Sequence, residues 1–109
     1  MGRVGNKVAL VTGAAQGLGA AIASMLANEG ASVMLTDINA DGAASMAASI
    51  NKQRANCAAS LHQDVTDEKR WGEVLDGTVE RFGGLNVLVN NAGIGSVGSI
   101  EDESLEKWH

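Results

Sequence analysis

The stretch Thr12-Gly13-Ala14-Ala15-Gln16-Gly17-Leu18-Gly19 decides the fold of this chain. It follows an apolar run at residues 8–11 that is typical of a strand, and it opens a segment of helical character at residues 18–28. Glycines at a strand-to-helix turn let the backbone approach a pyrophosphate, and the helix N-terminus adds unpaired N–H groups and a positive dipole end. The stretch predicts a phosphate-binding loop, and a purely structural glycine turn is the competing interpretation.

Four apolar runs alternate with three segments of helical periodicity along the chain. The runs lie at residues 7–11, 32–36, 57–62 and 85–90, and their nearly continuous apolar character favours strands buried on both faces of a parallel sheet. The expected helical stripes are Leu18, Ile22, Met25 and Leu26 in the first helix, Ala43, Met46, Ala47 and Ile50 in the second, and Trp71, Val74, Leu75, Thr78, Val79 and Phe82 in the third. Gly30 is expected to cap the end of the first helix, Asn39 and Thr66 to cap the starts of the second and third, and Gly83 to end the third.

This order, β-α-β-α-β-α-β followed by the start of another helix, predicts an α/β fold with an open, doubly wound parallel (Rossmann) sheet. Parallel strands need crossovers, which are almost always right-handed, and the ligand site of such a sheet lies at the carboxyl ends of its strands. The polar motifs of the chain fall at those ends. We interpret residues 1–109 as the N-terminal part of a single dinucleotide-binding domain.

The composition excludes several classes of protein. Of the 109 residues 45% are hydrophobic, the net charge is −5, and the sequence has no basic stripe of the kind that a nucleic-acid-binding protein needs. No run reaches the roughly 18 apolar residues of a membrane span, and the N-terminus lacks the apolar region of a signal peptide. The single cysteine, Cys57, favours the cytoplasm and is expected to be a small buried hydrophobe. The two histidines and the cysteine lack metal-ligand spacing, so no metal site is expected.

Asp37 ends the second expected strand, 18 residues after Gly19 in the sequence. A carboxylate there can accept hydrogen bonds from both hydroxyls of an adenosine ribose and would repel a 2′-phosphate. The next residue, Ile38, carries no positive charge, and Gln16 in the glycine loop is also uncharged. The pattern favours NAD over NADP, with a capping role for Asp37 in the next helix as the alternative.

Two more motifs follow the third and fourth strands. Asp64 can accept a hydrogen bond from an adenine amino group while the N–H of Val65 serves a ring nitrogen; alternatively, Asp64 belongs to the turn into the third helix. Asn90-Asn91-Ala92-Gly93 offers amide donors and acceptors beside residues small enough for a ribose and a nicotinamide to pass, or else forms a structural turn. The expected cofactor-binding residues are therefore Gly13, Ala15, Gln16, Gly17, Leu18, Gly19, Asp37, Ile38, Asp64, Val65, Asn91, Ala92 and Gly93.

These motifs together resemble the short-chain dehydrogenase/reductase family, from Lys7 through Trp108, with the cofactor loop, the NAD-selecting Asp37, the adenine-contacting Asp64-Val65 and the strand-four signature at residues 90–93. The closest likeness is to NAD-dependent hydroxysteroid and cyclic-alcohol dehydrogenases. The resemblance implies hydride transfer between a secondary alcohol or ketone and the nicotinamide, with a tyrosinate as the base and a serine that orients the substrate. It also implies a homo-oligomer, a dimer or tetramer, in the complete enzyme.

The family's members run to roughly 250 residues, and the catalytic Asn, Ser, Tyr and Lys that the resemblance implies have no counterparts in residues 1–109, which contain no tyrosine. No catalytic residue is therefore assigned, and the 109-residue chain alone is expected to be inactive and to fold poorly. Three alternatives stay open: a non-catalytic dinucleotide-binding module, a 3-oxoacyl-carrier-protein reductase-like enzyme, and a methyltransferase of related topology, against which residues 90–93 argue.

Overall fold

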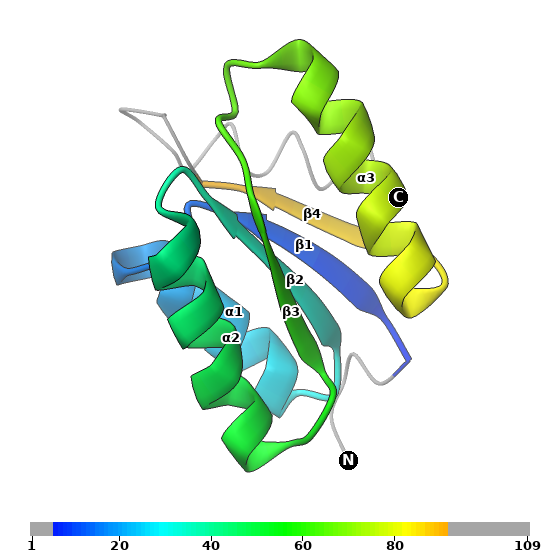
Figure 1. Cartoon of the computed structure of the whole chain (residues 1–109). Helices are drawn as coiled ribbons and strands as arrows, with labels where there is room; N and C mark the ends of the chain where they lie inside the picture. Colours follow the sequence, from blue (N-terminus) through cyan, green and yellow to red (C-terminus); the bar gives the residue numbers. More distant parts are fainter. Residues whose placement is uncertain (1–5, 92–109) are drawn as a thin grey trace.

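A parallel sheet of four strands forms the centre of the molecule in the computed structural model, which describes residues 6–91 (Figure 1). The strands are β1 (Val8–Thr12), β2 (Ser32–Asp37), β3 (Ala58–His62) and β4 (Val87–Asn90), and the helices are α1 (Gly17–Asn28), α2 (Ala40–Gln53) and α3 (Glu68–Phe82). The strand order is β3-β2-β1-β4. The predicted doubly wound fold is confirmed, and the predicted strand ends differ from the observed ones by one or two residues.

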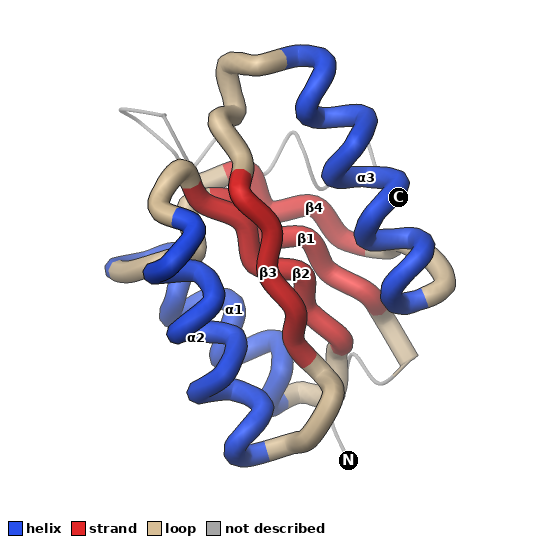
Figure 2. Tube along the Cα trace, viewed as in Figure 1, coloured by secondary structure: helices blue, strands red, loops and turns tan. Residues whose placement is uncertain are grey.

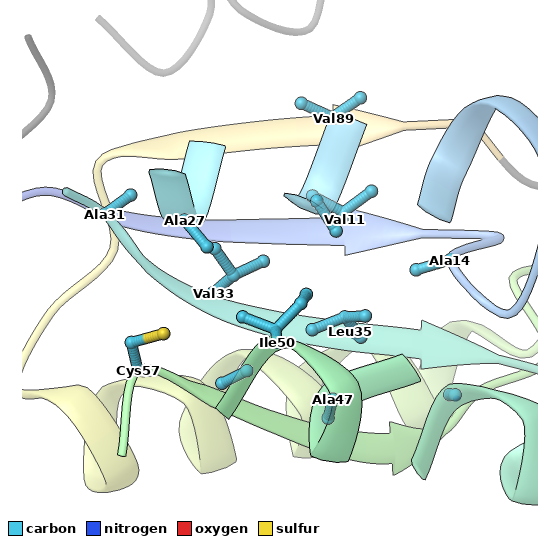
Figure 3. Packing of buried hydrophobic residues seen from close by; sticks show 13 residues of the cluster. Val11, Ala14, Ala27, Ala31, Val33, Leu35, Ala47, Ile50, Cys57 and Val89 are labelled. Atoms are coloured by element: carbon cyan, nitrogen blue, oxygen red, sulfur yellow. The ribbon is translucent and has the colours of Figure 1, made fainter. Parts of the chain in front are cut away.

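The sheet separates two apolar layers. Helices α1 and α2 cover one face and α3 covers the other (Figure 1). Side chains of one strand alternate between the layers: Val33 and Leu35 of β2 pack in the cluster under α1 and α2, whereas Met34 packs in the cluster under α3. Figure 3 shows the cluster under α1 and α2. The side chain of Ile50 from α2 packs onto the sheet there, and Cys57 is a buried member of the same cluster. The burial of Cys57 confirms its predicted role.

The apolar stripe that was expected for α1 is confirmed only in part: Ile22 and Leu26 are partly buried against the cluster, whereas Leu18 and Met25 are exposed. Leu18 and Met25 are each 56% exposed, and the fully buried positions of the helix are Gly19, Ala23 and Ala27. The most deeply buried positions of the helix carry small side chains, which allow close packing on the sheet, and the larger Ile22 and Leu26 lie at the border of this face. Hydrophobicity ranks leucine and methionine above alanine as core residues, so the sequence pattern placed the stripe to one side of the most deeply buried positions.

The predicted ends of the helices are mostly confirmed. Asn39 caps α2 by accepting the N–H of Gly42 at 3.0 Å, and Gly30 and Gly83 follow α1 and α3 with positive φ angles of 102° and 86°. The cap of α3 is not Thr66 but Asp67, which accepts the N–H of Arg70 at 3.2 Å.

The predicted face of α3 is confirmed for most of its members. Trp71 and Phe82 are partly buried against the cluster under the helix, and Val74 and Thr78 are fully buried. Val79 is the exception, because it is 48% exposed. It lies at the border of the buried stripe, where helical periodicity alone does not separate the two faces.

Asn51 fastens the last turn of α2 to the start of β3. Its Oδ1 accepts the N–H groups of Cys57 at 3.0 Å and Ala58 at 2.9 Å, and its Nδ2 donates to the Ala58 carbonyl at 2.9 Å. We expect Asn51→Leu to lower the unfolding free energy of the full-length protein by about 2–4 kcal/mol, because the change leaves backbone groups unpaired. Urea denaturation measures the loss. Ser49→Ala, an exposed neighbour on the same helix, is expected to change stability by less than about 0.5 kcal/mol; equal losses in the two variants would contradict the assignment.

Candidate functional site

The carboxyl ends of the strands bring the predicted site residues to one edge of the sheet. The loops that follow β1, β2 and β3 begin at this edge (Figure 2). Residues from all three loops line a common hollow. The site that the sequence predicts is therefore assembled from segments far apart in the chain, as expected for an open parallel sheet.

The glycine loop is bound to the end of β2. Gly13 and Gly17 both have a φ of 63°, a left-handed conformation that glycine adopts without strain. Between them, the N–H of Ala14 donates to the Thr36 carbonyl at 3.0 Å and the N–H of Ala15 donates to Asp37 Oδ2 at 3.0 Å. These two hydrogen bonds hold the glycine loop against the end of β2.

The opposite side of the glycine loop is bound to the end of β4. The Thr12 hydroxyl donates to Asn90 Oδ1 at 3.0 Å and accepts the N–H of Asn91 at 2.9 Å. Asn91 Nδ2 donates to the Gly13 carbonyl at 3.4 Å. The two asparagines therefore position the loop as well as ending the strand. Ala92 and Gly93, which complete the predicted motif, lie outside the described residues.

The start of α1 offers its N–H groups to an anion. Gln16, the N-cap residue, has an extended backbone and makes no side-chain capping bond, and the first turn contains no acidic residue. The first N–H groups of a helix have no partners within the helix, and the dipole places a partial positive charge there. Gly17, Leu18 and Gly19 form this turn, so the residues predicted for a pyrophosphate fit that group.

A hollow of about 260 Å³ lies beside the loop, between the ends of β2 and β3. It is lined by Gly13, Asp37, Ile38, Gln63, Asp64, Val65 and Thr66. Sites for whole drug-sized ligands span roughly 300–1,000 Å³, so this hollow fits one ring of a larger ligand. Its lining includes two apolar residues, Val65 and Ile38, of which Ile38 is 66% exposed.

Asp37 uses both carboxylate oxygens to order the loops around the hollow. Oδ2 accepts from Ala15, as described above, and Oδ1 accepts the N–H of Asn39 at 2.9 Å. The alternative that Asp37 caps α2 is wrong, because Asn39 is the cap. Each carboxylate oxygen can accept more than one hydrogen bond, so acceptor sites remain for the hydroxyls of a sugar.

Asp64 takes part in the turn into α3, as the second interpretation of this residue expected. Its Oδ1 accepts the Thr66 hydroxyl at 2.7 Å and the Thr66 N–H at 3.0 Å. These two bonds, the hydroxyl first, hold the pKa of the Asp64 carboxyl below its ordinary value. Within residues 6–91 no hydrogen bond to Oδ2 is present, so a ligand donor can use that oxygen.

The lowered pKa of Asp64 predicts a pH-dependent contribution to stability. Because folding lowers this pKa, the contribution is present above the unfolded value, near 3.8, and is lost as pH falls through the folded value. We expect Thr66→Val to lower the unfolding free energy of the full-length protein at about pH 6 and to do so less at about pH 3. Urea denaturation at both pH values measures the difference. A penalty that is independent of pH would show that the carboxylate charge is not involved.

Sequence reasoning missed two features of the site. Gln63 lines the hollow although no motif contains it; the available signal is its polar side chain directly after β3. The bond from Ala15 to Asp37 was also missed, because it involves a backbone N–H that any residue at position 15 provides. No group of metal-binding side chains occurs among residues 6–91, and no helix in that range is long and apolar enough to cross a membrane.

Several known proteins that are similar to this chain in sequence or structure are named as dehydrogenases. A family model for short chain dehydrogenases matches residues 7–109. Trans-4-hydroxycyclohexanecarboxylate dehydrogenase of Sinomonas cyclohexanicum is 44% identical over 111 residues, which cover 97% of this chain and 43% of that protein. The 3-alpha-(or 20-beta)-hydroxysteroid dehydrogenase of Mycobacterium tuberculosis is 44% identical over 107 residues, covering 98% and 40%.

The structural comparison agrees with the sequence comparison. A crystal structure of hydroxysteroid dehydrogenase from Escherichia coli matches with a TM-score of 0.81 and 37% identity, over 86% of this chain and 39% of that one. The chain spans less than half the length of the curated relatives that it matches.

Proposed function

The chain belongs to the short-chain dehydrogenase/reductase family, and we propose that the full-length protein is an NAD-dependent dehydrogenase of secondary alcohols, with cyclic alcohols or hydroxysteroids as its substrate class. Residues 6–91 form the part that binds the adenosine and pyrophosphate of the cofactor. The substrate class rests on the names of the relatives, which act on a hydroxycyclohexane carboxylate and on hydroxysteroids.

The single observation that carries the preference for NAD is the carboxylate of Asp37. It lies at the end of β2, anchored by the N–H groups of Ala15 and Asn39, and it lines the hollow. A ribose with free hydroxyls can donate to it, whereas a 2′-phosphate brings a second negative charge to the same place. Neither Ile38 nor Gln16 supplies a compensating positive charge.

The other contacts of the cofactor follow from the same edge of the sheet. The first turn of α1 (Gly17–Gly19) and the loop at Gly13 bind the pyrophosphate, and the hollow receives the adenine. Asp64 accepts from the adenine amino group and the Val65 N–H donates to a ring nitrogen. In our proposal Asn91, Ala92 and Gly93 border the ribose and nicotinamide.

The nicotinamide supplies the acceptor or donor of the hydride. The residues of this chain bind and orient the cofactor, and its glycine loop is held by hydrogen bonds from both sides. A general base must lie within hydrogen-bond reach of the substrate hydroxyl. The family resemblance implies a tyrosine for that role, and residues 1–109 contain none.

We also propose that the full-length protein is a cytoplasmic homo-oligomer.

The test is turnover by the purified full-length protein with NAD and with NADP, on cyclopentanol, cyclohexanol, a hydroxysteroid and a 3-oxoacyl thioester. We expect oxidation of cyclic secondary alcohols with NAD and much weaker activity with NADP. Activity confined to the thioester with NADPH would favour the acyl-carrier-protein reductase instead. Binding of NAD without turnover of any alcohol would favour a non-catalytic module.

A further inference from the structure

Gln63 connects the two walls of the hollow. Its side chain is buried, with 1% of its surface exposed, and its Oε1 accepts the Thr36 hydroxyl at 2.7 Å. Its backbone N–H donates to the Asp37 carbonyl at 3.0 Å. The residue directly before Asp64 is therefore bound twice to the end of β2, once through the side chain and once through the backbone.

Core packing does not explain a glutamine at this position. Gln63 Nε2 is shielded from solvent and has no hydrogen-bond partner among residues 6–91. A buried amide that lacks a partner lowers stability, whereas an apolar side chain of similar volume would fill the space without that penalty. The buried amide therefore has a cost in stability that an apolar side chain would avoid, which points to a role at the hollow that it lines.

Gln63 and Thr36 continue a row of polar side chains across the sheet. Leu10, Met34 and Leu88 belong to the cluster under α3. Two residues further along β1, β2 and β4, and so on the same face, lie Thr12, Thr36 and Asn90. Thr12 pairs in register with both Thr36 and Asn90.

The two halves of this row hold different parts of the site. The Thr12–Asn90 bond lies at the glycine loop, and the Thr36–Gln63 bond lies at the hollow. The Thr12–Asn90 bond positions the glycine loop for the pyrophosphate. By the same reasoning, the Thr36–Gln63 bond positions the walls of the hollow for the ring that enters it.

We propose that Gln63 and Thr36 form a positioning pair for the purine of the bound dinucleotide. The pair sets the spacing between the wall that contains Asp37 and Ile38 and the wall that contains Asp64 and Val65. This inference rests on the proposed function, because it takes the ligand of the hollow to be a purine. Walls that are held in place before binding lose less conformational freedom when the ring enters, which increases affinity.

The test uses the double variant Thr36→Val and Gln63→Met in the full-length protein. Both partners of the hydrogen bond become apolar groups of similar size, a replacement that is close to neutral or stabilising. We expect the Tm to be unchanged or higher and the Kd of ADP-ribose, measured by calorimetry, to rise about three- to tenfold. In turnover assays the effect is expected in KM for NAD rather than in kcat.

Thr78→Val is the matched control, because Thr78 is also fully buried on the α3 side and donates its hydroxyl to the Val74 carbonyl at 2.8 Å, away from the hollow. It is expected to leave ADP-ribose affinity unchanged. The single variants Thr36→Val and Thr36→Ser supply a second test that does not depend on the folding of the double variant: valine weakens binding and serine, which keeps the hydroxyl, restores it.

Three results would contradict the inference. Tight binding of ADP-ribose by the double variant would refute the pair while leaving the proposed function intact. A fall in Tm with an equal loss of affinity in the Thr78→Val control would show a structural role only. Failure of the wild-type protein to bind ADP-ribose would refute the cofactor site itself, and the inference with it.

Discussion

Replacing Gly19 by valine is expected to abolish cofactor binding by the full-length protein. A Cβ at this position would lie 2.7 Å from the carbonyl carbon of Gly13 and 2.9 Å from Asn91 Nδ2, and it would overlap the Gly13 carbonyl oxygen. Two of these neighbours are backbone atoms of the glycine loop, which cannot move aside as a flexible side chain can. The helix must separate from the loop, which destroys the anion site at its first turn.

The expected loss for Gly19→Val is about 3 kcal/mol or more in unfolding free energy, and at least about 100-fold in ADP-ribose affinity if the protein folds. Calorimetry and urea denaturation measure the two quantities. Gly72→Ala is the matched control: Gly72 lies in α3, and a Cβ there meets nothing within 4 Å. It is expected to stabilise the protein by about 0.5–1 kcal/mol. Wild-type ADP-ribose affinity in a folded Gly19→Val variant would refute the role of the close approach.

Changing Asp37 to alanine and Ile38 to arginine is expected to shift the preference of the full-length enzyme from NAD to NADP. Loss of the charge-assisted contacts to the ribose is expected to cost about 1.5–3 kcal/mol of transition-state stabilisation with NAD. This loss corresponds to a decrease in kcat/KM of about 10- to 150-fold. Arginine at position 38 then offers a positive charge to a 2′-phosphate beside the hollow. Steady-state kinetics with both cofactors measures the shift.

Asp41→Ala is the control for this prediction, because Asp41 is an exposed carboxylate in the first turn of α2 and does not line the hollow. It removes the same charge from the same region and is expected to leave the ratio of NAD to NADP activity unchanged. If the wild-type enzyme used both cofactors equally well, the assignment of Asp37 as the selecting residue would be wrong.

The order of the elements and the positions of the strands could be predicted because buried parallel strands and helices differ in apolar periodicity. The buried face of α1 could be predicted only in part, through Ile22 and Leu26, because the exact face depends on how the helix packs on the sheet. Leu18 and Met25 match a core stripe by hydrophobicity, yet Gly19, Ala23 and Ala27 are the residues whose size permits contact. Similarly, Thr66 and Asp67 both suit a helix cap, and only the geometry of the turn at Asp64 decides between them.

The candidate site could likewise be predicted from the sequence only in part. The ends of β1, β2 and β3 follow from the motifs, and the structure brings Gly13, Asp37 and Asp64 to one hollow. What the motifs did not indicate is how the site is held together. Gln63 and the hydroxyl of Thr36 belong to no motif, and their bond depends on the pairing of β2 with β3.

The central position of β1 has a consequence for the folding of the chain during its synthesis on the ribosome. Its first residue, Val8, is bonded to Asn86, 78 residues further along the chain, just before β4. At about 5–20 residues per second, synthesis of that interval takes about 4–16 s. For this time the edge of β1 that receives β4 stays open while β2 and β3 can already be in place. The strand made first is thus enclosed last, and the nascent chain must keep this apolar edge away from its neighbours on a polysome until β4 emerges.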